Sequence, residues 1–171
     1  MASKLKTDIL ETVSGSGTIA LTNQLSGMTS ASVPSGSVLQ VVHGHTTTLV
    51  TLTATTYVDS GLTASITPSS TSSKILVVVS HNGVRSKVSD SNAHGKIQLV
   101  RGSTSLKQLA SGLGYNAAND YNGDNASINW LDSPSTTSAT TYKTQIAAEG
   151  QTMEFQHSSG VASITLMEIK G

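Results

Sequence analysis

Histidine side chains are the first candidates for chemistry in this sequence, because they titrate near neutral pH and bind transition metals. His43 and His45 flank Gly44, and on a β-strand residues two apart point to the same side, a spacing that could hold a metal ion. No third ligand is identifiable nearby, and two ligands hold a metal weakly. We therefore expect polar turn residues here and no metal. The other histidines are His81, His94 and His157.

Acidic side chains offer a second route to chemistry, through glycoside cleavage or calcium binding. Residues 120–125, DYNGDN, are rich in oxygen ligands but lack the terminal Glu of a calcium loop. The chain contains no Gly-x-Ser-x-Gly, no phosphate loop ending in Gly-Lys-Ser/Thr and no His-Glu-x-x-His. We expect no catalytic residue, no cofactor and no enzyme activity. The acids in or beside predicted loops are Asp90, Asp120, Asp124 and Asp132.

Aromatic and amide side chains in one loop form a candidate recognition surface, because aromatic rings stack on sugars and dominate binding hot spots. The candidate receptor-binding residues are Tyr115, Tyr121, Asn122 and Asp124. Trp130 lies in an INWLD segment that reads as a strand, and we expect its ring to pack in the core.

The overall composition excludes several kinds of partner. Lys+Arg and Asp+Glu number 10 each, so the chain has no net field to attract nucleic acid or an anionic membrane. No apolar run approaches a membrane span, and the N-terminal residues lack the continuous apolar core of a signal peptide. Cysteine is absent, which excludes disulfides and thiolate metal sites. We expect a soluble product made in a cytoplasm.

The elements that would position these side chains are β-strands. Residues 62–67 alternate apolar and hydroxyl side chains, and residues 75–79 form an apolar run too short for a helix. Between them, Pro68 and the serines and threonines of residues 67–73 favour a turn. The simplest interpretation is a hairpin of two strands.

Residues 38–171 are predicted to form one all-β domain, an antiparallel β-sandwich of the jelly-roll kind. Turn residues separate nearly all of the predicted strands, and two longer loops, 82–95 and 111–125, interrupt the rhythm. The predicted strands are residues 38–43, 47–58, 61–67, 74–80, 96–101, 105–110, 127–131, 141–148, 152–156 and 162–170.

Residues 1–35 are predicted to form an N-terminal docking arm. They contain too little apolar mass to fold alone, so we expect them to become ordered against a partner; a plain flexible leader is the alternative. The apolar residues that would make the docking contact are Leu5, Ile9, Leu10, Val13, Ile19 and Leu21.

The last predicted strand is apolar on both faces. Ile164 and Leu166 fall on one face, and Met167 and Ile169 fall on the other. A strand buried on both sides lies either in the centre of a sandwich or at a seam between subunits. These four residues are therefore the candidate seam between subunits.

Particular strings in the sequence resemble a family of small virion structural proteins of tailed bacteriophages. The most specific are ITPSSTSSKILV and LDSPSTTSATTYK, accompanied by LKTDILETVSGSGTIALTN, GSVLQVV, IQLVRGST and ASITLMEIK. The family is common in phages of cyanobacteria and other aquatic bacteria, and many members are labelled tail fibre or tail-fibre-like. The resemblance covers almost the whole chain.

This resemblance implies a homotrimeric β-sandwich located in the virion and made in the host bacterial cytoplasm. The short arm and compact head favour a cement or decoration protein on the capsid exterior, bound to the major capsid protein or another virion protein. The alternative is a short tail fibre that recognises host surface polysaccharide, a glycan partner, through its long loops. Neither role calls for nucleic acid or a membrane as a partner.

Overall fold

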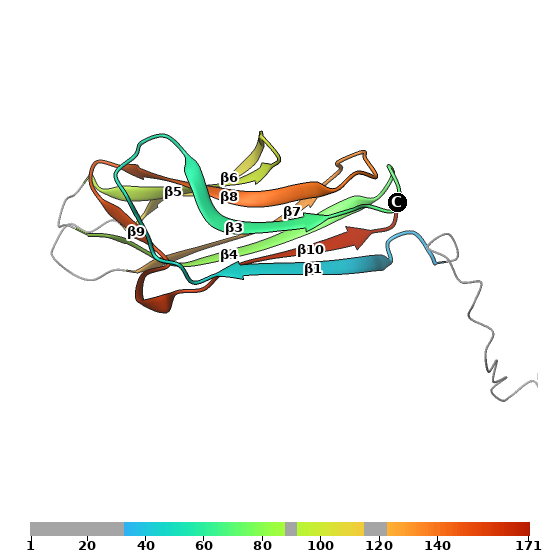
Figure 1. Ribbon diagram of the computed structural model, residues 1–171, viewed down its shortest axis with the longest axis horizontal. Coiled ribbons are helices and arrows are strands. Elements are labelled where there is room, and N and C mark those ends of the chain that lie inside the picture. The colour runs from blue at the N-terminus through green and yellow to red at the C-terminus, as the bar shows by residue number, and fades with distance from the viewer. Residues whose placement is uncertain (1–32, 88–91, 115–122) are drawn as a thin grey trace, which may run out of the picture. The chain divides into compact units, whose positions relative to one another are not determined.

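The computed structural model describes residues 33–87, 92–114 and 123–171, and residues 34–171 form one compact unit. Two antiparallel β-sheets face each other in this unit (Figure 1). The strands are β1 (Val38–Thr46), β2 (Val50–Leu52), β3 (Val58–Ile66), β4 (Lys74–Ser86), β5 (His94–Arg101), β6 (Thr104–Leu113), β7 (Asp124–Asp132), β8 (Thr140–Glu149), β9 (Met153–Phe155) and β10 (Ala162–Ile169). A 3-10 turn, His157–Ser159, separates β9 from β10. Within the described ranges, no helix is long and apolar enough to cross a membrane.

The strand order is that of a jelly roll. One sheet runs β1-β10-β4, with β7 also paired to β4, and the other runs β3-β8-β5-β6. The short β9 pairs with the last two residues of β4, and the short β2 pairs with β9. When those two are left out and the remaining strands are counted in chain order, the first sheet holds the first, eighth, third and sixth strands. The second sheet holds the second, seventh, fourth and fifth. This order confirms the predicted antiparallel sandwich.

Apolar residues on the facing sides of the sheets fill the space between them. Leu62 and Ile66 of β3 meet Ile75 and Val77 of β4 in one cluster, and a second cluster forms around Phe155. The alternation expected for strands with one buried face is visible throughout β3, β4 and β10. Trp130 packs against the first cluster from β7, as predicted.

The segment predicted to be a hairpin is not one. β3 pairs with β8 and β4 pairs with β10 and β7, so the two strands lie in different sheets and residues 67–73 cross from one sheet to the other. Turn chemistry fixed the change of direction, but it does not decide which strands pair. The pairing depends on contacts with strands distant in the sequence.

Three other predicted boundaries are corrected. Of the strand predicted over residues 47–58, only Val50–Leu52 is regular, and Val58 begins β3. β4 continues to Ser86 and β5 begins at His94, so much of the predicted loop 82–95 is strand. β6 and β7 likewise shorten the loop predicted over residues 111–125.

Candidate interaction surfaces

An apolar row crosses the outward side of the β1–β10–β4–β7 sheet. Cross-strand register places Val41 beside Met167, Met167 beside Leu76, and Leu76 beside Leu131, one residue from each strand. A neighbouring row joins Val38 to Ile169. We call this surface the apolar face: Val38, Val41, Leu76, Leu131, Met167 and Ile169.

The two ends of the main row are the most open. Val41 is 57% exposed and Leu131 is 52% exposed, whereas Leu76 and Met167 are half-buried by their neighbours in the row. Covering a half-exposed Val or Leu is worth on the order of 1 kcal/mol. A contiguous apolar row of this kind is a common mark of a protein–protein contact.

The two histidines at the end of β1 flank this face. The turn predicted at His43 and His45 is wrong, because both lie within β1. Their side chains point to the same side of the strand, and their rings stack with centroids 5.9 Å apart. The Nδ1 atom of His43 is 3.0 Å from the Thr165 hydroxyl. Among the residues that the structure describes, no cluster of three or more His, Cys, Asp or Glu side chains could hold a metal.

The structure separates the four candidate seam residues into two pairs. Ile164 and Leu166 are fully buried in the core between the sheets, where a neighbouring chain has no access. Met167 and Ile169 are partly exposed and belong to the apolar face. Of the four candidate seam residues, only Met167 and Ile169 can contact another subunit. Ile164 and Leu166 are buried by the sandwich itself.

A buried carboxylate holds the crossing segment 67–73 against this sheet. Glu168 of β10 is fully buried and accepts hydrogen bonds from the Ser69 amide and hydroxyl (2.7 Å each), the Ser73 hydroxyl (2.6 Å) and the Gln40 amide (2.6 Å). Burial opposes ionisation, but the bonds from Ser73, Gln40 and Ser69 outweigh it and hold the pKa of Glu168 below its usual value. The serines of this turn thus bind the carboxylate of Glu168.

A chain of buried polar groups joins the two sheets. The Thr144 hydroxyl of β8 shares hydrogen bonds with Nε2 of His81 on β4 (2.7 Å) and with the Ser60 hydroxyl of β3 (2.6 Å). When the Gln156 oxygen accepts from His81 Nδ1 (2.9 Å), the Gln156 nitrogen donates to the carbonyls of Thr48 and Phe155. Burial lowers the pKa of His81 to about 4, so the ring is neutral at physiological pH.

These hydrogen-bonded groups are not accessible to a substrate. His81 and Thr144 are fully buried and Ser60 is 1% exposed, so no exposed nucleophile lies beside the histidine. Every group along the chain has its hydrogen-bond partner, and among the described residues no buried side-chain nitrogen or oxygen lacks one. The arrangement fixes the two sheets relative to each other.

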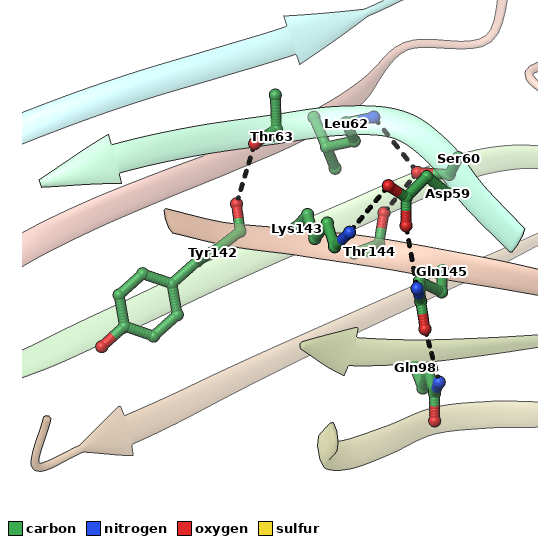
Figure 2. A network of polar contacts seen from close by, with 9 residues as sticks. All are labelled: Asp59, Ser60, Leu62, Thr63, Gln98, Tyr142, Lys143, Thr144 and Gln145. Carbon is green, nitrogen blue, oxygen red and sulfur yellow. Dashed lines mark hydrogen bonds and ion pairs between the residues drawn. The ribbon is translucent and has the colours of Figure 1, made fainter. Parts of the chain in front are cut away.

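Polar side chains cover the outward side of the β3–β8–β5–β6 sheet. Asp59 bonds Lys143 (2.7 Å) and Gln145 (2.8 Å), and Gln145 in turn accepts from Gln98 (2.8 Å), as Figure 2 shows. Gln98 accepts from the Ser105 hydroxyl (2.9 Å). The bonds from Lys143 and Gln145 lower the pKa of Asp59. We call this surface the polar face: Asp59, Thr63, Gln98, Ser105, Lys143 and Gln145.

Comparison with known proteins gives no family. No protein-family model matches the chain, and no curated protein matches it. Among solved structures, the fold is similar to the infectious bursal disease virus VP2 subviral particle, with a TM-score of 0.48 and 13% identity over 77% of this chain and 33% of that chain. A structure of the Gx strain of infectious bursal disease virus gives a TM-score of 0.41 and 13% identity over 80% of this chain and 33% of that chain. The chain thus spans about a third of the length of the solved structures that it matches.

Most of the predicted receptor and docking residues lie outside the described ranges. This is true of Tyr115, Tyr121 and Asn122, and of all six docking residues, which are Leu5, Ile9, Leu10, Val13, Ile19 and Leu21. Asp124 is described: it begins β7, and its carboxylate accepts a hydrogen bond from the Gly114 amide (2.6 Å). That bond ties the start of β7 to the end of β6.

Two residues of the interior were missed by sequence reasoning, although a signal for each was present. Glu168 follows Ile164 and Leu166 at the period of two that predicts one face of a strand. His81 follows Ile75, Val77 and Val79 in the same way. A polar residue at an inward position of a strand should have been expected to have a buried partner.

Proposed function

We propose that this chain is a non-enzymatic structural protein of a bacteriophage virion, a homotrimer that stabilises the capsid exterior as a cement or decoration protein. The phage-like strings of the sequence and a jelly-roll fold support a virion role, since this fold is common in capsid proteins. Fold alone does not define a function. The observation that carries the proposal is the apolar face.

The occupant proposed for the apolar face is a second copy of this chain. The formal net charge is zero, so copies do not repel each other at neutral pH. Each copy presents the row from Val41 to Leu131, with Met167 at its centre and Ile169 beside it. Packing these rows against a neighbour removes apolar surface from water, which drives association.

Attachment to the particle is assigned to the N-terminal arm, residues 1–35. Three arms on one trimer raise the effective concentration of each arm once the first has bound, so weak contacts add up to slow dissociation. Deleting residues 1–25 should leave a folded oligomer that no longer sediments with particles. If the shortened protein still decorates them, the arm is not the anchor.

Copy number in purified particles tests the location on the virion. Quantitative mass spectrometry would compare this chain with the major capsid protein in gradient-purified virions. A copy number on the scale of the capsid lattice supports decoration. A copy number on the scale of a single tail supports the alternative, a short tail fibre that binds host polysaccharide, and absence from the particle overturns both.

A further inference from the structure

Two shallow cavities lie near the polar face and share Thr141 as a lining residue. One, of about 290 Å³, is lined by Asp59, Gly61, Leu62, Thr63, Thr141 and Lys143. The other, of about 320 Å³, is lined by Arg101, Gly102, Pro134, Thr136, Ala139, Thr140 and Thr141. Thr141 lines both, so the two cavities lie near each other at the start of β8.

The cations of the two cavities are paired within the protein. Lys143 lies 2.7 Å from the Asp59 carboxylate, and Arg101 lies 2.7 Å from the Asp132 carboxylate. The Tyr142 hydroxyl donates to the same Asp132 oxygen (2.7 Å). An anionic ligand would have to displace a carboxylate from each cation, so the charges favour a neutral ligand.

Side-chain amides extend in a row across the sheet from Asp59, which lines the first cavity. In the row drawn in Figure 2, the carboxamides of Gln145 and Gln98 each use one N–H and one oxygen lone pair in the bonds described. A carboxamide has two N–H donors and two lone pairs, so each retains one donor and one acceptor. A sugar hydroxyl both donates and accepts, and is complementary to such a pair.

The backbone behind the row is held firmly. The register of β3 against β8 shifts between Asp59 and Thr63, where Gly61 takes a φ of 85°. Next to Asp59 on the same strand, Ser60 points into the core and bonds Thr144 (2.6 Å). One bulge therefore directs Asp59 outward and anchors its neighbour inward, so a ligand meets side chains whose positions are already fixed.

We propose that the polar row and the two cavities beside it bind a neutral polysaccharide, with Asp59, Gln145 and Gln98 bonding sugar hydroxyls across the strands and Thr63 and Thr141 bonding them along the cavities. The site lies outside the predicted receptor loops. It goes beyond the proposed structural role and depends neither on the oligomer nor on location in the capsid or the tail. Failure of the glycan test would leave the oligomer test untouched.

The test is titration calorimetry of the full chain with linear neutral hexasaccharides of glucose, galactose and mannose, and with oligogalacturonate as the acidic probe. At least one neutral probe should bind, and the acidic probe should bind more weakly. Gln145→Ala should weaken binding at least about tenfold, because it removes a donor and an acceptor. Gln98→Ala, on the adjacent strand, should act in the same direction.

Asn129→Ala is the matched control, since Asn129 is an exposed amide on β7 in the other sheet. Its affinity should stay within about twofold of the wild type, well inside one hydrogen bond's worth of binding energy. The thermal midpoint of each variant shows that it folds, and Gln98→Ala serves alone if Gln145→Ala does not. Binding of no neutral probe, preference for the acidic probe, or equal affinity of the glutamine variants and the wild type would each overturn the proposal.

Discussion

The apolar face and the polar face are the outward surfaces of two sheets of four main strands each. They differ in whether their side chains have partners within the protein. On the polar face, each carboxylate and carboxamide of the row bonds a neighbour on the sheet. On the apolar face, Val41 and Leu131 stay more than half exposed at the ends of their row. A surface satisfied by its own bonds is stable in water, whereas an apolar row gains free energy when it is covered. This difference is the reason for proposing a protein contact on the apolar face and a hydroxyl-bearing ligand on the polar face.

The largest expected loss of stability comes from a substitution in the sheet that bears the apolar face. Glu168→Ala removes the acceptor of the bonds from Gln40, Ser69 and Ser73, leaving these donors in a buried site. Unfolding free energy should fall by about 3 kcal/mol or more. Amide hydrogen exchange should quicken in β1, β10 and residues 67–73 but little in β5 and β6.

Glu168→Gln is the matched control for that substitution. It keeps the shape of the side chain and one acceptor oxygen, so its loss of stability should be smaller than that of Glu168→Ala. Equal and uniform loss of exchange protection in both sheets would show that the two faces are not independently supported.

The second largest expected effect is a pH dependence of stability caused by His81, which links the two sheets through Thr144. The pKa of His81 is about 4 in the folded chain and about 6.5 when unfolded, so the unfolded state binds a proton first as the pH falls. Stability is therefore complete above pH 6.5 and declines through the interval down to about pH 4, by on the order of 3 kcal/mol. Urea unfolding at a series of pH values measures this decline.

Substituting the histidine isolates its contribution. His81→Gln keeps an acceptor for Thr144 but cannot titrate, so its stability should change much less between pH 6.5 and 4.5. Below that interval Glu168 and Glu154, whose pKa values are also lowered in the fold, lose their contribution in both proteins. A decline of the same size in His81→Gln would assign the pH dependence to other groups.

The smallest effect is on the polar face. Asp59→Asn weakens the ion pair with Lys143 on an exposed surface and should cost less than about 1 kcal/mol. Screening should reduce even that difference in 1 M salt. A loss as large as that of Glu168→Ala would mean that the polar row supports the fold and is not merely a surface.

The sequence predicted what depends on local pattern and missed what depends on distant pairing. Alternation identified most strands and the inward side of β10, and turn residues identified the crossing segment. The hairpin prediction was wrong because Ser69 and Ser73 are bound by Glu168, 99 and 95 residues away in the chain. The same limit applies to the surfaces.

The apolar row shows that limit most clearly. Val41, Leu76, Leu131 and Met167 come from four separate strands, and each alone is an ordinary outward apolar residue. Only the register between strands makes them neighbours, and register is set by the pairing of whole strands. The polar row from Asp59 to Gln98 was hidden for the same reason.

The mass of the full chain in solution, measured by sedimentation equilibrium, tests most directly whether the apolar face is a contact between copies. The wild type should be a trimer, and Val41→Asp should weaken association at least about a hundredfold, because it places a charge in the contact. Val58→Asp, the same change at a 38% exposed position of β3 in the other sheet, should leave the trimer intact. A monomeric wild type, or equal association of Val41→Asp and Val58→Asp, would contradict the account.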